Sequence, residues 1–360
     1  MRKIIFLILL NVLSITTTFG QADSTTKFIE AFKLTMIGKA LPTRNPYHRM
    51  DTTFYKGMTG AENQQARCSA GLALAFSTNS TYIDLLPVYK WEHKKDNMTG
   101  ISTAGFDLYI KRKNQWVYAG SGAPSVRNTV FTIVSDMDTT VKECLLYLPI
   151  YSELDELKVG IQKDASIKPI PDPFRKKIVF FGSSYTQGVC ASRPGMSYPM
   201  QIERNLNIHV CNLGFSGNSK LQPYFAEMIA AIDADAIVFD AFSNPDETMI
   251  RDRLALFLDI VTKKHQKTPL IFVQTIHRGN SNFSDKIRDR EDKKRTAAKE
   301  LMPVAMKKYK NVFFIENPLP ANLSEDISAD GVHPSDLGYY YWAKNLSDQL
   351  SKILKIRRVK

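Results

Sequence analysis

Residues 177–188, which read KIVFFGSSYTQG, constrain the fold more than any other stretch of the chain. Ile178 to Phe181 form a short, continuous apolar run of β-branched and aromatic residues, a pattern typical of a strand buried on both faces. Gly182 ends the run, and Ser183 and Ser184 follow where a helix can begin. The stretch predicts a serine at the carboxyl end of a parallel strand, where α/β enzymes place their chemistry. A helix N-cap is the simpler role for either serine.

The rest of the second half of the chain alternates apolar runs with segments of helical periodicity. Strands are expected at 177–181, 209–213, 236–241, 270–275 and 312–315, and helices at 198–206, 221–232, 248–264, 287–308 and 334–353. Strands that alternate with helices in this way predict an α/β fold with a flavodoxin-like, doubly wound, five-stranded parallel sheet. In such a sheet the carboxyl ends of the strands meet at one edge, so residues far apart in the sequence can share a site.

The segment Asp330-Gly331-Val332-His333-Pro334 supplies the partners that a nucleophilic serine needs. A base must take the serine proton, and a carboxylate must orient that base and stabilise its charged form. In a turn-like segment Asp330 can contact one imidazole nitrogen of His333 while the other nitrogen faces a serine. Pro334 suits the first position of a helix, which places this loop just outside the last predicted helix.

Four short blocks, in order across residues 176–353, resemble the SGNH/GDSL hydrolases. The blocks are Gly182-Ser183-Ser184, the stretch NLGFSGN at 212–218, the stretch FSNP that contains Asn244, and Asp330 with His333. Two positions depart from the pattern of the family. Ser183 stands where the first block has aspartate, and Phe242 stands where the third block has glycine, which bears on the assignment of Asn244.

The resemblance implies a serine esterase and a role for each matched residue. Ser184 would be the nucleophile, His333 the base and Asp330 the acid that orients the base. The oxyanion hole would consist of the Ser184 and Gly214 backbone N–H groups and the Asn244 side chain.

Four more side chains near these blocks are candidates for substrate contact. Arg193 follows the nucleophile closely, His277 follows the fourth predicted strand, and Ser216 and Asn218 lie in the second block. Each also has a simpler interpretation as a loop or surface residue. The chain has no glycine-rich phosphate loop and no histidine cluster with metal-ligand spacing, so we expect neither a cofactor nor a metal.

Residues 23–165 carry a different pattern, in which short strand-like runs are separated by turn residues. The runs are 67–76, 82–90, 106–112, 115–119, 129–133, 142–149 and 157–161. Such spacing predicts an antiparallel β-sandwich. The stretch GFDLY at 105–109 is similar to the G-x-D-L-Y motif of a domain that precedes certain bacterial SGNH esterases, which implies a jelly-roll-like accessory domain. For Asp107 and Tyr109 we prefer structural roles, in a hairpin turn and in the core, to ligand contact.

Three prolines in residues 166–173 predict a semi-rigid linker, followed by the catalytic domain at 174–360. At the other end, Met1 to Gly20 predicts a signal peptide: Arg2 and Lys3 precede an apolar stretch that is too short to span a bilayer comfortably. No cysteine lies at the expected cleavage point, so no lipid anchor is expected. Location in the periplasm or secretion follows, and no membrane span is expected elsewhere.

Export permits disulfides, and the four cysteines, Cys68, Cys144, Cys190 and Cys211, allow three full pairings. Four separate thiols are the alternative. The formal net charge is +12, but the basic residues are spread along the chain and no nucleic-acid motif is present, so we expect no nucleic-acid partner.

Together these features predict an exported serine esterase that acts on short acyl esters, with an acylated carbohydrate as the expected substrate. Two alternatives stay open at this point. One is a carbohydrate-binding protein with a degenerate hydrolase half, and the other is an acyltransferase that uses the same triad. The sequence does not decide the acyl length, the oligomeric state or the role of the sandwich.

Overall fold

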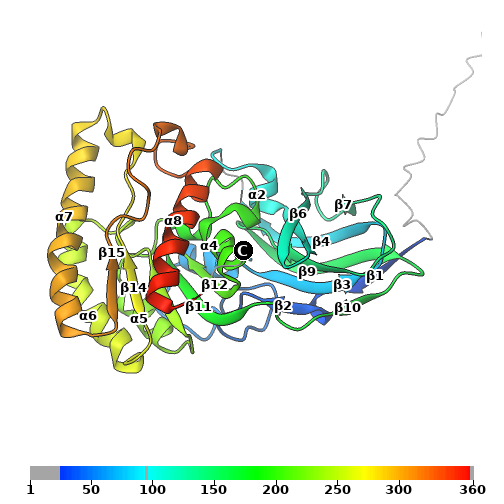
Figure 1. The fold of residues 1–360 in the computed structure, drawn as a ribbon, viewed down its shortest axis with the longest axis horizontal. Helices are drawn as coiled ribbons and strands as arrows, with labels where there is room; N and C mark the ends of the chain where they lie inside the picture. Colours follow the sequence, from blue (N-terminus) through cyan, green and yellow to red (C-terminus); the bar gives the residue numbers. More distant parts are fainter. Residues whose placement is uncertain (1–24, 94–95, 357–360) are drawn as a thin grey trace, which may run out of the picture.

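The computed structural model describes residues 25–93 and 96–356, and the described strands form three sheets (Figure 1). Two antiparallel sheets make up the N-terminal part, and a parallel sheet with helices follows. Met1–Gly20, where the sequence predicts a signal peptide, lies outside the described residues. Within the described ranges, no helix combines the length and the apolar character that crossing a membrane requires.

The C-terminal sheet has the strand order β12-β11-β13-β14-β15, and every neighbouring pair is parallel. Its strands are β11 Arg175–Gly182, β12 Ile208–Gly214, β13 Ala236–Phe239, β14 Leu270–Val273 and β15 Val312–Ile315. Its helices are α3 Ser184–Gln187, α4 Tyr198–Leu206, α5 Pro223–Ala230, α6 Glu247–Lys264, α7 Asp285–Lys308 and α8 Asp336–Leu354. This strand order confirms the predicted flavodoxin-like, doubly wound sheet.

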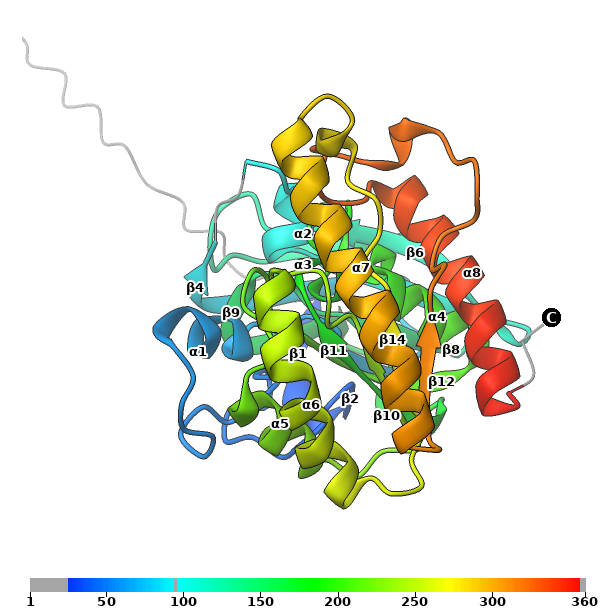
Figure 2. The same ribbon diagram turned by 90° about the vertical axis from the view of Figure 1, so that its left-hand side faces the viewer.

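Alternate residues of β11 face opposite layers of helices, because successive side chains of a strand point to opposite faces. Ile178 and Phe180 pack in the core that contains α4 and α8, whereas Val179 and Phe181 pack in the core of α5, α6 and α7. All four side chains are at most 1% exposed. Figures 1 and 2 show α6 and α7 at the end of the molecule that lies away from the antiparallel sheets.

The N-terminal part is the predicted antiparallel sandwich. One sheet has the order β1-β9-β4-β7, with β1 Thr26–Glu30, β9 Ser152–Gln162, β4 Ile83–Glu92 and β7 Phe131–Val134. The other has the order β10-β3-β8-β5-β6, with β10 Ile167–Pro169, β3 Ala73–Thr78, β8 Lys142–Tyr147, β5 Phe106–Arg112 and β6 Gln115–Gly122, and β2 Thr35–Ile37 pairs with β3. Apolar residues of both sheets, such as Leu74, Leu108 and Val159, form one core between them.

Some local predictions were wrong. The run at 67–76 is not one strand, because helix α1 Gly60–Arg67 ends at its first residue and β3 begins at Ala73. Helix α1 begins with a capping box between Thr59 and Glu62. The predicted linker contains a strand, because β10 pairs with the edge of β3. Pro334 precedes the helix rather than starting it, since Ser335 is the N-cap of α8.

The two parts share a hydrophobic core. Tyr109 and Tyr147 of the sandwich belong to the same buried cluster as Phe180 and Tyr198 of the α/β part. The Tyr147 hydroxyl donates to Glu203 of α4 at 2.6 Å, and burial raises the pKa of that carboxyl to about 7. Because the core is continuous, the sandwich can place side chains at fixed positions on the α/β part.

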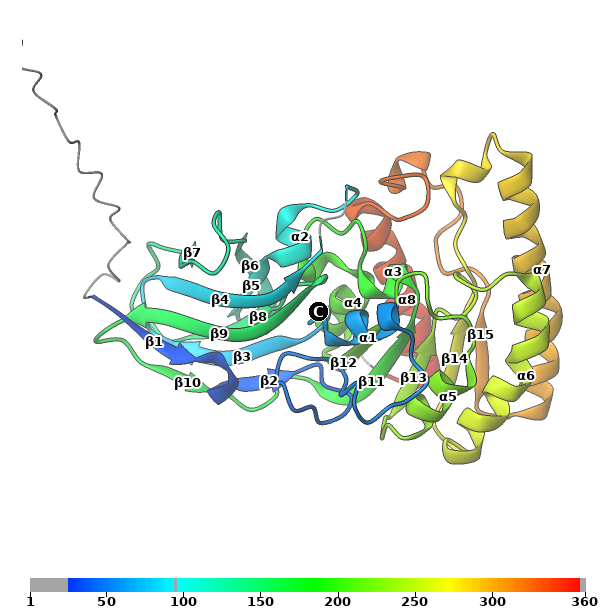
Figure 3. The ribbon, with the colours of Figure 1, turned by 180° about the vertical axis from the view of Figure 1, so that it is seen from behind.

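The segment around α1 also contacts the α/β part, next to α3 and β12 (Figure 3). The buried Arg49 guanidinium donates to the carbonyl oxygens of Gly214 at 2.9 Å and of Asn212 at 3.1 Å. This contact fixes the end of β12, where the second sequence block begins. Cys144 and Cys211 are buried free thiols, so none of the three full disulfide pairings is present.

Candidate active site

Ser184 occupies the turn that joins β11 to α3. The strand ends at Gly182, and Ser183 caps the helix, because its hydroxyl accepts a hydrogen bond from the Tyr185 N–H at 3.1 Å. A Cβ atom at position 182 would lie 2.2 Å from Thr186 Oγ1, so the turn requires glycine there. The cap role therefore belongs to Ser183, and the Ser184 hydroxyl is available for another partner at the carboxyl end of the strand.

That partner is His333, which the structure brings to Ser184 from 149 positions away. His333 Nε2 lies 3.0 Å from Ser184 Oγ, and His333 Nδ1 lies 2.7 Å from Asp330 Oδ2. Asp330 Oδ1 accepts from the backbone N–H groups of Val332 at 2.9 Å and His333 at 2.6 Å. The three side chains thus form a chain from carboxylate to imidazole to hydroxyl, the arrangement that activates a serine.

The Asp330 carboxylate is held in its ionised form. Partial burial alone would raise its pKa, but hydrogen bonds from the His333 N–H, the Asn97 side chain and the His333 ring hold that pKa well below its ordinary value. The loop that carries it is fixed on both sides. The Asn280 N–H donates to Gly331 O at 2.9 Å, and the Tyr185 hydroxyl donates to Val332 O at 2.9 Å.

The two glycines of the second block differ in their surroundings: Gly214 is tightly packed and Gly217 faces open space. The Gly214 N–H already donates to Asn212 Oδ1 at 2.9 Å, and a Cβ at position 214 would lie 2.1 Å from the Gln187 backbone N. The prediction that Gly214 supplies an oxyanion donor is therefore not supported. Gly217 has a positive φ of 73° and, among the described residues, faces open space. It lines a hollow of about 360 Å³ together with Asn244.

Asn244 follows β13 and lies against the second block. Its Nδ2 donates to Ser219 Oγ at 3.1 Å and, over a longer 3.3 Å, to Phe215 O. Phe242, which replaces the glycine of the third block, is fully buried against Phe272 and Phe314. This departure from the family pattern therefore fills the core and leaves Asn244 at the edge of the sheet.

The structure gives Arg193 a partner in the sandwich. Arg193 Nη1 donates to Asp107 Oδ1 at 2.7 Å, to Asp107 Oδ2 at 2.6 Å and to the Tyr109 hydroxyl at 2.7 Å. Burial raises the pKa of the Asp107 carboxyl, while the guanidinium opposes that shift. The guanidinium is therefore engaged between the two parts, not directed at a substrate. Tyr109 is part of the hydrophobic core, as preferred above, whereas Asp107 lies in β5 at this junction and not in a hairpin turn.

Ser216 and Asn218 shape the second-block loop. The Ser216 N–H donates to Gln187 Oε1 at 3.0 Å, and Asn218 Nδ2 donates to Gln65 Oε1 at 3.1 Å. Their predicted substrate contact stays a prediction.

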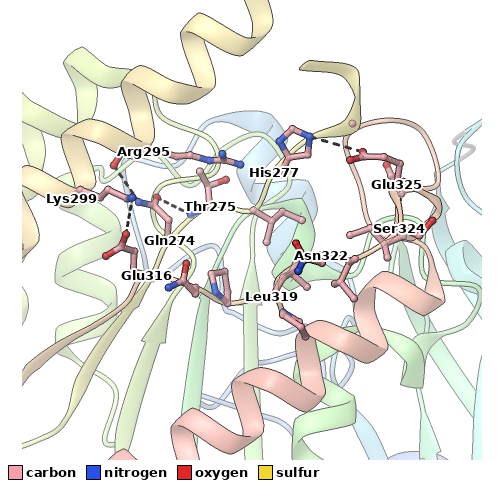
Figure 4. A pocket seen from close by; sticks show the side chains of 18 residues that line it. Gln274, Thr275, His277, Arg295, Lys299, Glu316, Leu319, Asn322, Ser324 and Glu325 are labelled. Atoms are coloured by element: carbon pink, nitrogen blue, oxygen red, sulfur yellow. Dashed lines mark hydrogen bonds and ion pairs between the residues drawn. The ribbon is translucent and has the colours of Figure 1, made fainter. Parts of the chain in front are cut away.

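His277 follows β14 and lines a separate cavity of about 350 Å³ between the segments that follow β14 and β15 (Figure 4). Its Nε2 lies 2.8 Å from Asn282 Oδ1 and 3.9 Å from Glu325. Arg295 lines the same cavity, but Ser184 is not part of its wall. The structure gives His277 partners in this cavity, and its predicted contact with substrate stays a prediction.

One group of described residues has the side chains of a metal site. Ligand atoms of Cys190, Asp330 and His333 lie within 4.8 Å of one another. The carboxylate and the imidazole are already hydrogen bonded to each other, and Cys190 Sγ lies 3.6 Å from Asp330 Oδ2. A metal ligated by all three would replace the bond between acid and imidazole, so a metal-bound arrangement and the serine-activating one exclude each other.

Comparisons with known proteins cover both parts of the chain. The model of the GDSL-like lipase/acylhydrolase family matches residues 175–353, and the model for the N-terminus of SGNH-hydrolase-type esterases matches residues 26–167. A crystal structure from Bacteroides ovatus ATCC 8483, described as a GDSL-like lipase, is 39% identical, with a TM-score of 0.90 over 93% of this chain and 100% of that chain. The chain belongs to the GDSL-like lipase/acylhydrolase family. It is thus an esterase or acylhydrolase.

More distant structures share the fold of this GDSL hydrolase. The salicylyl-acyltransferase SsfX3 of a tetracycline biosynthetic pathway is 16% identical, with a TM-score of 0.72 over 92% of this chain and 99% of that chain. A family two carbohydrate esterase from Clostridium thermocellum in complex with cellohexaose is 14% identical, with a TM-score of 0.59 over 79% of this chain and 93% of that chain. A search of curated proteins gave no match.

Asp240 is a residue of this GDSL hydrolase that sequence reasoning missed. It follows β13, is fully buried, and accepts hydrogen bonds from the Ser183 N–H at 3.1 Å, the Ser183 hydroxyl at 2.5 Å and Thr186 Oγ1 at 3.2 Å. The Ser243 hydroxyl donates to its other oxygen. Burial raises the pKa of this carboxyl. Asp240 thus joins the turn that carries Ser184 to the segment before Asn244.

Proposed function

We propose that this GDSL hydrolase is an exported serine esterase that removes acetyl or other short acyl groups from carbohydrate, with Ser184, His333 and Asp330 as its catalytic triad. The observation that carries the proposal is the position of the His333 ring, with Nε2 3.0 Å from Ser184 Oγ and Nδ1 2.7 Å from Asp330 Oδ2. Export rests on Met1–Gly20, which lie outside the described residues.

The proposed reaction has two halves. His333 Nε2 takes the proton of Ser184 as the hydroxyl oxygen attacks the ester carbonyl, and Asp330 stabilises the imidazolium that forms. The imidazolium returns that proton to the departing alcohol, which leaves an acyl group on Ser184. Water, deprotonated by His333, then attacks the acyl carbon and releases the acid, and the proton returns to Ser184.

The oxyanion requires donors close to Ser184 Oγ. We assign this role to the Ser184 N–H, the Gly217 N–H and the Asn244 side chain. Asn244 Nδ2 would exchange its longer hydrogen bond, 3.3 Å to Phe215 O, for a bond to the oxyanion. Gly217 takes the place first predicted for Gly214, because the Gly214 N–H is engaged with Asn212. Gly217 and Asn244 line the same hollow, and Asn244 contacts the second-block loop that carries Gly217 through Phe215 O and Ser219 Oγ.

Asn244→Ala should lower kcat by about 10²-fold to 10³-fold with little change in KM, because an oxyanion donor acts mainly in the transition state. The measurement is steady-state hydrolysis of p-nitrophenyl acetate. Asn114→Ala, in the exposed turn between β5 and β6, is the matched control for loss of an amide side chain. Equal rates for the two variants would place the oxyanion hole elsewhere.

The carbohydrate part of the proposal is supported by the predicted export and, at the level of fold, by the family two carbohydrate esterase. A panel of p-nitrophenyl esters of increasing acyl length and of acetylated sugars tests it, with Ser184→Ala as the blank. We expect release of acetate from both kinds of acetyl ester and slower reaction with long chains. Preference for long chains, or no acetate from any acetylated sugar, would contradict the substrate assignment.

The same panel distinguishes hydrolysis from transfer. The fold similarity to an acyltransferase makes this comparison necessary. With added acceptor alcohols, a hydrolase should still give mainly free acid, whereas an acyltransferase would give a new ester that mass spectrometry detects.

A further inference from the structure

A side chain of the sandwich reaches the acid of the triad. Asn97 lies between β4 and α2 Gly100–Ala104, and its Nδ2 donates to Asp330 Oδ2 at 2.7 Å across 233 positions of sequence. The same oxygen pairs with His333 Nδ1 at 2.7 Å. The other oxygen of Asp330 accepts from the backbone of its own loop. Asn97 is therefore the side-chain amide that holds Asp330 Oδ2, the oxygen that also contacts His333 Nδ1.

Neighbouring contacts hold Asn97 in place. Thr99 is the N-cap of α2, with its hydroxyl accepting from the Ser102 N–H at 3.0 Å and donating to Ser192 O at 2.6 Å. Met98 packs against the hydrophobic core that both parts share. Figures 1 and 3 show α2 at the junction of the two parts, next to the start of α8. The segment is thus attached to the sandwich and to the loop after the nucleophile.

A second contact across the junction fixes the same loop. The buried Asp107 carboxylate accepts from Arg193 Nη1 at 2.6 Å and from the Gly195 N–H at 2.8 Å. The loop at 192–195 is therefore held by the sandwich through both Asp107 and Thr99. The Thr99 contact therefore ties the segment that carries Asn97 to a loop that the sandwich also holds through Asp107.

The chemistry of an amide suits this position. A carboxylate that orients an imidazole must stay ionised and must not rotate. A neutral N–H donor favours the ionised form and fixes the rotamer without adding a charge that would compete with His333. An aspartate in the same place would have the same size but would repel Asp330, and an alanine would leave Asp330 Oδ2 without this donor.

We propose that the N-terminal sandwich completes the catalytic site, with Asn97 as a positioning residue that holds the Asp330 carboxylate against His333. The inference rests on the proposed esterase function. It gives the sandwich a role in the reaction itself, apart from any binding of substrate.

The test compares full-length Asn97→Asp and Asn97→Ala with wild type on p-nitrophenyl acetate. We expect kcat of Asn97→Ala to fall by about 10-fold to 100-fold, the range of one hydrogen bond to a charged group, and kcat of Asn97→Asp, which also adds repulsion, to fall at least as far. KM should change little, because Asn97 contacts the acid and not the ester. Asn114→Asp, in the exposed β5–β6 turn, adds the same charge and should match wild type.

The pH profile separates positioning from general damage. A negative charge, or the loss of a donor, beside Asp330 stabilises the His333 imidazolium, so the acidic limb of kcat/KM should move to higher pH in both variants. The other titratable groups here are unchanged: Cys190, with Sγ 3.6 Å from Asp330 Oδ2, and Tyr185, whose ring centroid lies 5.7 Å from that of His333. A substitution that only destabilises the protein would lower the fraction of folded enzyme. It would leave the pH of the acidic limb of kcat/KM unchanged.

The outcomes are distinct. A wild-type kcat and an unmoved acidic limb in folded Asn97→Asp would overturn the inference while the esterase proposal stands. If Asn97→Asp does not fold, as judged by thermal unfolding, the same two readouts from Asn97→Ala decide. If the wild-type protein has no activity that depends on Ser184, the proposed function itself fails, whatever the variants of Asn97 do.

Discussion

Ser184→Ala should abolish turnover of p-nitrophenyl acetate, with kcat reduced by about 10⁴-fold or more. The substitution removes the oxygen that attacks the carbonyl, so only the oxyanion donors and substrate binding remain. Ser184 Oγ is the hydroxyl that meets His333 Nε2, at 3.0 Å, and no change of backbone is needed to remove it. The fold should survive, because alanine fits the start of a helix.

The neighbouring serine provides a sharp control. Ser183 lies one position away, but its hydroxyl donates to the buried Asp240 carboxylate at 2.5 Å and caps α3. Ser183→Ala should therefore lower the melting temperature, because it removes about 1 kcal/mol for the helix cap and a further ~1.5–3 kcal/mol for the hydrogen bond to the buried carboxylate. It should keep most of the activity. Loss of turnover in Ser183→Ala with turnover retained in Ser184→Ala would reverse the assignment of the two serines.

The parallel sheet was predictable because its signal is local. The apolar runs at the five strands are short and continuous, and the helical segments between them show a clear period, so element types and order follow from the sequence alone. That order also predicts that Ser184 meets Asp330 and His333, since strand ends converge at one edge of the sheet. Their roles in catalysis stay predictions until activity is measured.

What the sequence did not reveal is of two kinds. The engagement of the Gly214 N–H with Asn212 is a local contact of the Asx-turn type, and the match to the family pattern overlooked it. The other kind is contact between residues far apart in the chain. The contact of Asn97 with Asp330 joins segments 233 positions apart. By contrast, signals for α1 and β10 were present: Thr59 and Glu62 form a capping box, and proline is tolerated in an edge strand such as β10.

Asp330→Asn should lower kcat by about 10⁴-fold at neutral pH. The carboxylate accepts a hydrogen bond from the His333 Nδ1–H, which leaves Nε2 unprotonated and able to take the Ser184 proton. An amide in this place can donate to Nδ1, and the ring proton then resides on Nε2, facing the serine. Asp292→Asn, on the exposed face of α7, makes the same change of charge and should leave kcat unaltered.

The dependence on pH provides an independent check, because the pKa of Asp330 is held well below its ordinary value. A carboxyl with a lowered pKa in the folded state contributes stability that is present above its unfolded pKa of about 3.9 and is lost as the pH falls through the folded pKa. The difference in melting temperature between wild type and Asp330→Asn should therefore be largest near neutral pH and narrow below about pH 4. A difference that is constant from pH 7 to pH 3 would mean that the carboxylate is not stabilised by its hydrogen bonds. The fall in kcat of Asp330→Asn would then need an explanation other than the loss of a carboxylate that orients His333.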